Sequence, residues 1–564
     1  MCSPHAAEAP YEQLWVLCKY YLACARDVGV VQHKVAPGSL RHQSSDYIAA
    51  AIAVALALLE PPPTGQPSSS LPPYLELRVR CLLADMFLKH GANPTDAEAH
   101  IQKALLLAAQ VDPSGTYKFR AMHLQAAFLE KMGNLAAAEK LQTATIKEAF
   151  DTRLVSHGYY FIDQMIEFLI RHNNFRMAFN IIMYGIKVSE QLGNTAMRIY
   201  YLVLLTHHAL LFQTTAKTTK LLMDMKAFFT ENKPVGNPSI TASDLASPFR
   251  AHYFLLTTLN HLKAGHTKQA LDSLPAVQSV LEQWTPSSDD EAQGHFVIPL
   301  NPSTLPGAGS STISISSGGP LSANPSTNIS QSPFVHTVGA TRAPVRQSAD
   351  LAHTSHVAVK WLGKTQLYAI VYLLSALCYQ PDAVNAKCKA FLAEGLKCVQ
   401  AGMDTTGGAD SVDATLRTQQ WLGRIRIHLL LHTADFGLMR GELDAAERAI
   451  LETIQWCEWL GTWDRFKVAV CLRWGMLCQQ TGKLTEALEY FEVCFQDAKT
   501  TELKTLVQLH KVLVYLGQEH FDQPQVRDLM DAIRNDCETT LPSGYRAAFK
   551  ILESVMATEF IKAK

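Results

Sequence analysis

The residues Gly363-Lys364-Thr365 have the types that end a phosphate-binding loop, in which backbone N–H groups and a lysine hold the phosphates. Such a loop also needs a glycine five residues before Gly363, where this sequence has Ala358. The flanking residues have the apolar spacing of a helix. The sequence therefore disfavours a nucleotide site at this position.

The cysteines and histidines also lack the spacing of a metal or catalytic site. The chain has 12 cysteines and 21 histidines but no Cys-x-x-Cys, His-Glu-x-x-His or Gly-x-Ser-x-Gly. His207 and His208 are adjacent, so on a helix they point about 100° apart and do not face one metal. Without a recognisable signal peptide, we expect reduced, mostly buried thiols. The sequence predicts no catalytic residue, no cofactor and no metal.

The elements that would position any site are helical hairpins. Apolar residues recur with the period of 3.6 typical of helices, and the period of 2 typical of strands is almost absent. The clearest hairpin matches the tetratricopeptide (TPR) pattern. Small residues, Gly475 and Ala487, are placed where its two helices cross, and Gly482 ends the first helix with a positive φ. Phe491 is expected to fill the gap to the next hairpin.

The same pattern recurs along the chain. Ala97, Ala138 and Ala178 lie 41 and 40 residues apart, and Ala446 and Ala487 lie 41 apart, whereas the standard TPR unit has about 34 residues. The predicted fold is therefore all-α, a TPR-like superhelix of long hairpins. The predicted turn residues are glycines and one left-handed asparagine: Gly91, Gly133, Asn173, Gly265, Gly441 and Gly482.

Two segments interrupt this pattern. Residues 61–73 contain prolines, which lack the N–H donor of a helix. Residues 285–356 are rich in Ser, Pro, Gly, Thr and Asn, and we expect a disordered insertion there. The insertion divides the chain into an N-terminal array, 11–284, and a C-terminal array, 357–564.

The insertion contains candidate phosphorylation sites. Ser287 and Ser288 precede three acidic residues, and Ser332 precedes a proline. These patterns suit an acidophilic and a proline-directed kinase, respectively. Segments of this composition also contain such matches by chance.

Stacked hairpins form a superhelix whose first helices line a concave surface that holds a peptide or an extended partner segment. In the N-terminal array this surface is predicted to carry both charge signs and an aromatic ring, although the same residues also suit an ordinary solvated face. The candidate partner-binding residues are Arg78, Asp85, Arg120, His123, Glu130, Tyr160, Asp163, Glu167 and Arg171.

The corresponding positions in the C-terminal array are apolar or neutral. They lack the cations that would clamp a free C-terminal carboxylate, and such a surface is often covered by the chain itself. The predicted residues are Ala469, Leu472, Met476, Gln479 and Gln480. Nearby, Trp456, Trp459 and Trp463 have the spacing of one helix face, which suits either a packed core or a partner contact.

Composition excludes several classes of protein. The 564 residues include 50 basic and 51 acidic ones, so no net positive charge attracts a nucleic-acid backbone. Hydrophobic residues make up 48% and charged residues 18%, which suits a large buried core rather than a disordered chain. No apolar run reaches the ~20 residues of a membrane-spanning helix.

Two stretches resemble the cohesin loading factor family. One runs from Trp361-Leu362-Gly363-Lys364 to Ser375, and the other is Lys389-Ala390-Phe391-Leu392 through Glu394-Gly395-Leu396-Lys397. Three segments nearer the N-terminus, 47–59, 76–80 and 97–104, also occur in the order that the family shows. The resemblance covers about residues 45–500 and is weakest in the insertion and in the last 60 residues.

This resemblance implies a non-enzymatic scaffold subunit of the cohesin loader. It implies a large HEAT-repeat partner (Nipped-B-like), whose N-terminal segment the N-terminal array wraps. Cohesin would be reached indirectly and chromatin through the partner, in the nucleus, without strong direct nucleic-acid binding and without a membrane. The alternative is another TPR scaffold, of the anaphase-promoting-complex or proteasome-lid type. A proteasome-lid subunit would end in a winged helix, whereas residues 549–561 suggest a plain helix.

Overall fold

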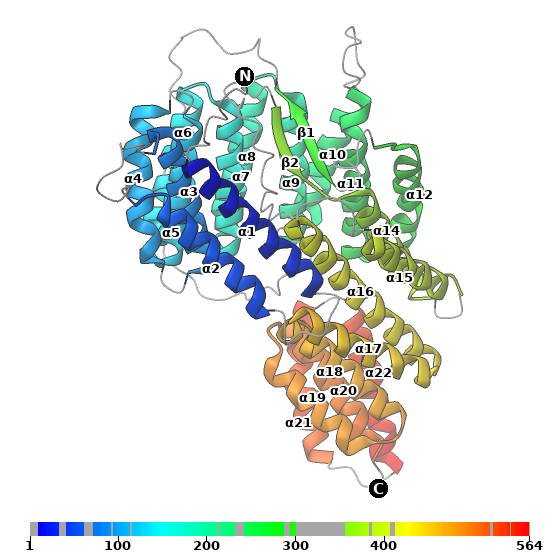
Figure 1. The fold of residues 1–564 in the computed structure, drawn as a ribbon. Coiled ribbons are helices and arrows are strands. Elements are labelled where there is room, and N and C mark those ends of the chain that lie inside the picture. The colour runs from blue at the N-terminus through cyan, green and yellow to red at the C-terminus, as the bar shows by residue number, and fades with distance from the viewer. Residues whose placement is uncertain are drawn as a thin grey trace, which may run out of the picture.

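Helical hairpins make up most of the protein, and the predicted all-α, TPR-like fold is confirmed. The computed structural model describes residues 10–32, 41–60, 71–91, 94–112, 115–212, 215–231, 242–286, 294–300, 356–382, 386–405, 412–518, 523–541 and 543–562. Figure 1 shows the hairpins stacked side by side along the chain. The candidate phosphorylation sites Ser287, Ser288 and Ser332 lie outside the described residues.

The first half of the chain consists of consecutive antiparallel helix pairs. Each pair is joined by a short connection, and neighbouring pairs contact one another. The helices are α1 (Pro10–Gln32), α2 (Arg41–Ala57), α3 (Pro73–His90), α4 (Thr95–Val111), α5 (Thr116–Lys131), α6 (Leu135–Asp151), α7 (Val155–Arg171), α8 (Phe175–Gln191), α9 (Thr195–Phe212), α10 (Thr215–Glu231), α11 (Ala242–Lys263) and α12 (Thr267–Gln283).

Two short strands precede the helices of the second half. The elements are β1 (His295–Pro299), β2 (His356–Lys360), α14 (Lys364–Tyr379), α15 (Lys387–Thr405), α16 (Val412–Arg440), α17 (Leu443–Leu460), α18 (Trp463–Gln480), α19 (Leu484–Asp497), α20 (Thr501–Leu516), α21 (Gln523–Asn535), the π-helical turn η3 (Asp536–Thr540) and α22 (Ser543–Lys562).

The turns follow the predicted chemistry with one exception. Gly482 has φ +79° and Asn173 has φ +58°, so both adopt the left-handed conformation that ends the first helix of a hairpin. Gly133, Gly265 and Gly441 do the same. Gly91 has φ −70° and an extended backbone, and the connection between α3 and α4 is one residue longer than those of α5–α6, α7–α8 and α11–α12.

Small residues set the distance between packed helices. A Cβ atom on Gly475 would lie 2.6 Å from the ring of Phe491, and Ala487 is fully buried. Phe491 is itself fully buried, and its ring stacks 5.4 Å from His510 of α20, which agrees with its expected place in the gap to the next hairpin. A Cβ atom on Gly158 of α7 would likewise lie 2.5 Å from the ring of Phe150 on α6.

A two-stranded antiparallel ribbon corrects part of the predicted insertion. Strand β1 falls inside residues 285–356, where no regular structure is expected, and pairs with β2 so that Phe296 lies opposite Val359. Alternate side chains, including Phe296, Ile298, Val357 and Val359, are buried in the cluster that also holds residues of α7, α9 and α11. The ribbon forms because it buries one apolar face on helices that are distant in sequence.

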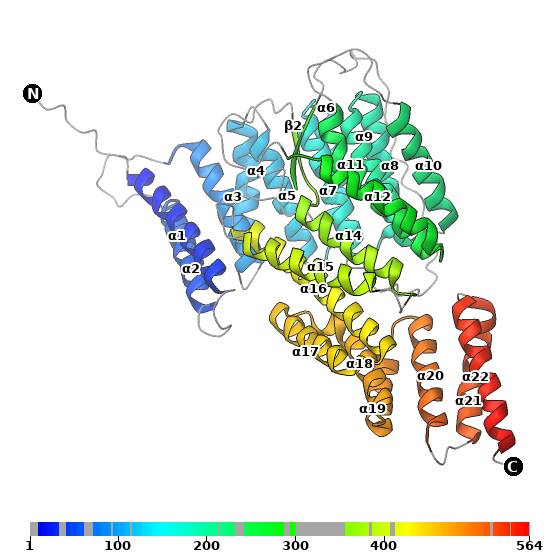
Figure 2. The ribbon, with the colours of Figure 1, turned by 90° about the vertical axis from the view of Figure 1, so that its right-hand side faces the viewer.

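The helices continue across the insertion. Helix α14 packs on α11 and α12, and its residues join the same hydrophobic cluster. The first pair of the predicted C-terminal array therefore lies directly against the last pair of the N-terminal array. Helix α1 contacts α16, so the superhelix curves until its first hairpin meets its second half (Figures 1 and 2).

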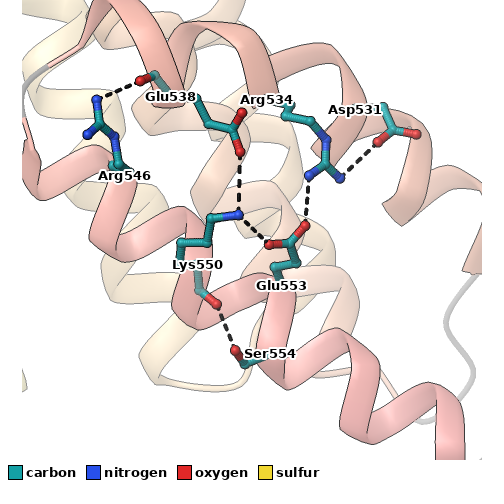
Figure 3. Close-up of polar contacts among 7 residues, drawn as sticks. All are labelled: Asp531, Arg534, Glu538, Arg546, Lys550, Glu553 and Ser554. Carbon is teal, nitrogen blue, oxygen red and sulfur yellow. Dashed lines mark hydrogen bonds and ion pairs between the residues drawn. The ribbon is translucent and has the colours of Figure 1, made fainter.

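The last hairpin is held by ion pairs as well as by apolar packing. Figure 3 shows Arg534 of α21 between Asp531 and Glu553, at 3.2 and 2.7 Å, and Lys550 of α22 between Glu538 and Glu553, at 3.4 and 2.9 Å. Every cation of this group has an acidic neighbour. Helix α22 spans residues 549–561, which agrees with the plain helix expected there.

The tryptophans Trp456, Trp459 and Trp463 do not share one helix, which corrects the prediction. Helix α17 ends at Leu460, and Gly461 is left-handed with φ +62°. Trp463 therefore begins α18. Trp456 and Trp459 remain neighbours with ring centroids 5.1 Å apart. In the described ranges no helix is long and apolar enough to span a membrane.

Candidate protein-binding surface

The first helices of the hairpins form one side of the superhelix, which we call the inner face: α3, α5, α7, α9, α11, α14, α16 and α18. Contacts of α3 with α5, α9 with α11, α11 with α14, α14 with α16 and α16 with α18, together with ring pairs that join α5 to α7 and α7 to α9, place successive members beside one another. The nine candidate residues lie on the first three of them: Arg78 and Asp85 on α3, Arg120, His123 and Glu130 on α5, and Tyr160, Asp163, Glu167 and Arg171 on α7.

Three of the candidates form an ion-pair network between α5 and α7. Arg171 donates from Nε and Nη2 to the two oxygens of Glu130 at 3.1 and 3.0 Å, and it lies 3.7 Å from Glu167. His172 adds a contact to Glu130 at 3.0 Å. Because Arg171 is half exposed, such pairs contribute only ~0–1 kcal/mol each. The network orients these side chains more than it stabilises the fold.

Two further candidates support the surface through aromatic and hydrogen-bond contacts. The buried Tyr201 hydroxyl donates to Asp163 at 3.1 Å. Burial, followed by the nearby Asp163 charge, raises the pKa of Tyr201 well above its usual range. The rings of His123 and Tyr160 are 5.6 Å apart and join α5 to α7.

The candidates on α3 do not join this network. The Arg78 guanidinium lies 5.6 Å from the ring of Trp15 on α1, and Asp85 pairs with Lys89 at 2.9 Å. Arg120 on α5 is exposed. Arg78 therefore links the inner face to the first hairpin, whereas Arg120 points its charge to solvent.

The ribbon covers the inner face beyond α7. Trp361, which follows β2, packs its ring 5.4 Å from Tyr200, 5.6 Å from Phe249 and 5.0 Å from His252. Burial lowers the pKa of His252 to about 3, so its ring is neutral at pH 7. The chain thus covers its own inner face at α9 and α11. The sequence favours such covering in the C-terminal array instead.

The C-terminal inner face differs from the prediction in its charge. Leu472 is buried and Gln479 contacts His510 at 3.3 Å, as neutral positions should. The predicted positions nevertheless omit a group of cations on α16 and α18. Arg465 follows Arg424 by 41 residues, the local repeat length, and this recurrence is the signal that could have revealed them.

The described residues form neither a metal-ligand cluster nor a phosphate-binding loop at Gly363–Thr365. No group of three or more His, Cys, Asp or Glu side chains within them could hold a metal ion. At Gly363 the backbone N–H donates to the Gln366 side chain at 2.8 Å, and Lys364 donates to the Trp284 carbonyl at 2.6 Å. The groups that would hold a phosphate are thus used within the chain.

The sequence model of the cohesin loading factor family matches residues 11–564, nearly the whole chain. The chain belongs to this family. No curated protein sequence matches the chain. The cohesin loading factor match extends through the insertion and the last 60 residues, where the resemblance in the sequence is weakest.

One solved structure supports the fold of this cohesin loading factor chain, and two others are similar at lower TM-scores. Scc4, from the crystal structure of Scc4 in complex with Scc2n, is similar with a TM-score of 0.54 at 12% identity, covering 97% of this chain and 79% of that one. Naa15/Naa10 bound to HypK-THB has a TM-score of 0.31 at 8% identity, covering 90% and 77%. The Cut9-Hcn1 hetero-tetramer of APC/C has a TM-score of 0.25 at 11% identity, and the match covers 96% of this chain and 96% of that one.

Proposed function

We propose that this cohesin loading factor chain is the non-enzymatic scaffold subunit of a cohesin-loading complex. It would bind the N-terminal segment of a large HEAT-repeat subunit (Nipped-B-like). The family match over residues 11–564 carries the proposal, and the solved complex of the structurally similar Scc4 with Scc2n supports it. The part of the inner face on α3, α5 and α7 would receive the segment, because the ribbon covers α9 and α11.

The wider role follows from the same proposal. Cohesin would be reached indirectly and chromatin through the partner, in the nucleus, because the 50 basic and 51 acidic residues leave no net positive field. Affinity purification from nuclear extract followed by mass spectrometry tests this. The expected result is a giant HEAT-repeat protein with cohesin subunits, and recovery of proteasome-lid or anaphase-promoting subunits instead would contradict it.

The surface itself is tested by charge reversal at Arg120. This side chain is exposed on α5, so Arg120→Glu should leave the fold intact and weaken binding of the partner segment about tenfold. Glu167 is buried beside Arg171 and is unsuitable for reversal. Affinity is measured by titration calorimetry with the partner's N-terminal segment.

The matched control is Lys140→Glu on α6, a second helix away from the inner face, where the residue is exposed. Its affinity should equal that of the wild type. If Arg120→Glu also binds with unchanged affinity, the segment does not lie on this part of the inner face.

A further inference from the structure

A group of arginines and histidines lies on the inner face of the second half of the chain. Arg424 and His428 of α16 are four residues apart and so share one face of the helix. Arg465 occupies the position on α18 that Arg424 occupies on α16, and Arg473 corresponds in the same way to His432. Because α16 and α18 contact each other, this recurrence gathers positive charge in one place. We call these five residues the cationic cluster.

One side of the cluster is neutralised within the protein. Arg473 donates from Nη2 to Asp435 at 2.6 Å, from Nε to the Leu431 carbonyl at 3.1 Å and from Nη1 to the Ala469 carbonyl at 2.9 Å. His432 lies 3.5 Å from the same carboxylate of Asp435. Burial raises the pKa of the Asp435 carboxyl group. The nearby Arg473 and His432 have the larger combined effect and lower it, so this carboxylate is charged and already paired with them.

The other side of the cluster has donors that the described protein does not use. Arg424 Nε and His428 Nε2 are buried atoms without a hydrogen-bond partner among the described residues. Buried polar groups are normally satisfied, and a buried cation without a counter-charge is costly. This contrasts with the last hairpin, where Arg534 pairs with Glu553 and Lys550 pairs with Glu538 (Figure 3).

The electrostatics of these donors favour an anionic ligand. Burial lowers the pKa of the Arg424 guanidinium, and burial together with the charge of Arg424 lowers that of Arg465. Burial, then the charges of His432, Arg465 and Arg473, lowers the pKa of His428 to about 3. His428 is therefore a neutral N–H donor beside two arginines that repel each other.

We propose that Arg424, His428 and Arg465 bind the carboxylate of an Asp or Glu side chain carried by an extended protein segment on the inner face. A planar guanidinium matches a carboxylate with two parallel hydrogen bonds, and a neutral imidazole adds one donor. The nearby Asp435 charge disfavours a phosphate dianion relative to a single carboxylate. This inference rests on the proposed function, because the acidic residue is supplied by the partner's N-terminal segment.

Binding of that segment to the intact chain tests the assignment. Arg424→Gln should weaken binding about tenfold or more, because a hydrogen bond to a charged group contributes ~1.5–3 kcal/mol. Arg424→Lys, which keeps the charge, should recover part of the loss. Arg426→Gln is the matched control, since Arg426 lies on the same helix but pairs with Glu452 at 2.8 Å and with Gln400 at 2.7 Å. Its affinity should be unchanged.

A second measurement does not depend on the partner. A hexaglutamate peptide should raise the melting temperature of the wild-type chain and not that of Arg424→Gln. Without peptide, Arg424→Gln should melt no lower than the wild type, because it removes a partly buried cation whose Nε has no hydrogen-bond partner among the described residues. This comparison also shows that the variant is folded.

The outcomes separate the two proposals. If the wild type binds the partner segment and Arg424→Gln binds it equally well, the carboxylate site is wrong and the proposed function stands. If the wild type does not bind the segment, the proposed function fails, and the hexaglutamate comparison decides the site by itself. If phosphatase treatment of the segment abolishes the Arg424-dependent part of binding, the occupant is a phosphate and the carboxylate assignment is overturned.

Discussion

At the scale of single residues, small side chains decide how closely the hairpins pack. Gly475 faces the ring of the fully buried Phe491 at a distance that leaves no room for a Cβ atom. The sequence places Gly475 at the helix crossing and Phe491 at the gap to the next hairpin, because each position has a defined role in the TPR pattern. Residue type and spacing are enough to place a small residue at Gly475, since the crossing joins two helices of one hairpin, whereas the structure shows that the Phe491 ring is what faces it.

Replacing Gly475 with alanine should destabilise the protein by about 1–3 kcal/mol, because the added methyl group must displace the Phe491 ring. Chemical denaturation followed by circular dichroism measures the change. Gly544→Ala on α22 is the control, since nothing lies within 4 Å of its added Cβ and the helix gains propensity. Equal stability of the wild type and Gly475→Ala would mean that the ring moves aside freely.

The candidate binding residues illustrate the limit of residue patterns. The repeat register places Glu130 and Arg171 on the inner face, and the structure shows that they pair with each other. Arg120 remains exposed, and Asp163 is engaged by Tyr201. Register therefore predicts which helix face a residue occupies, whereas the partner of each charge depends on helices about forty residues away.

At the scale of elements, the ribbon is the main departure from the expected helices. Its strands have five residues each, too few for the period of 2 to stand out in a helical sequence. They belong to segments far apart in the chain, and they become stable by burying one face on α7, α9 and α11. The ribbon is part of the core, and it covers a stretch of the inner face.

Phe296→Ala should therefore cost about 3–5 kcal/mol of stability, as for a buried core phenylalanine, because this side chain is only 2% exposed. Val297, the next residue of β1, points away from the helices and is 60% exposed. Val297→Thr should change stability by less than about 0.5 kcal/mol. Thermal unfolding of both variants checks the expectation, and similar losses for the two would show that the ribbon does not pack as described.

At the scale of the whole molecule, buried neutral histidines link stability to pH. Burial lowers the pKa of His207 and His208 to about 4 and that of His252 to about 3, below the value of 6.5 expected for an unfolded chain. Above pH 6.5 these rings are neutral in both the folded and the unfolded state, so they do not make the unfolding free energy depend on pH. As the pH falls below 6.5, only the unfolded state takes up protons.

The free energy of unfolding should then fall by about 1.4 kcal/mol per pH unit for each such histidine, down to its folded pKa. Urea unfolding at pH 7.5 and 5.5 measures the loss. His252→Phe removes one titrating ring. It should therefore reduce the dependence of the unfolding free energy on pH by the contribution of one histidine. A free energy of unfolding that is equal at the two pH values would contradict the buried, neutral state.

The sequence by itself determined the helices, their turns and the family, because helical periodicity, left-handed turn residues and small residues at crossing points are local and repeat every 40 or so positions. Only the tertiary structure decided the ribbon, the contact of α1 with α16 and the cationic cluster. Each of these joins segments distant in sequence. Arg424 or Arg465 alone resembles an ordinary surface cation, and only the stacking of one repeat on the next brings them together beside the buried Arg424 Nε and His428 Nε2 donors.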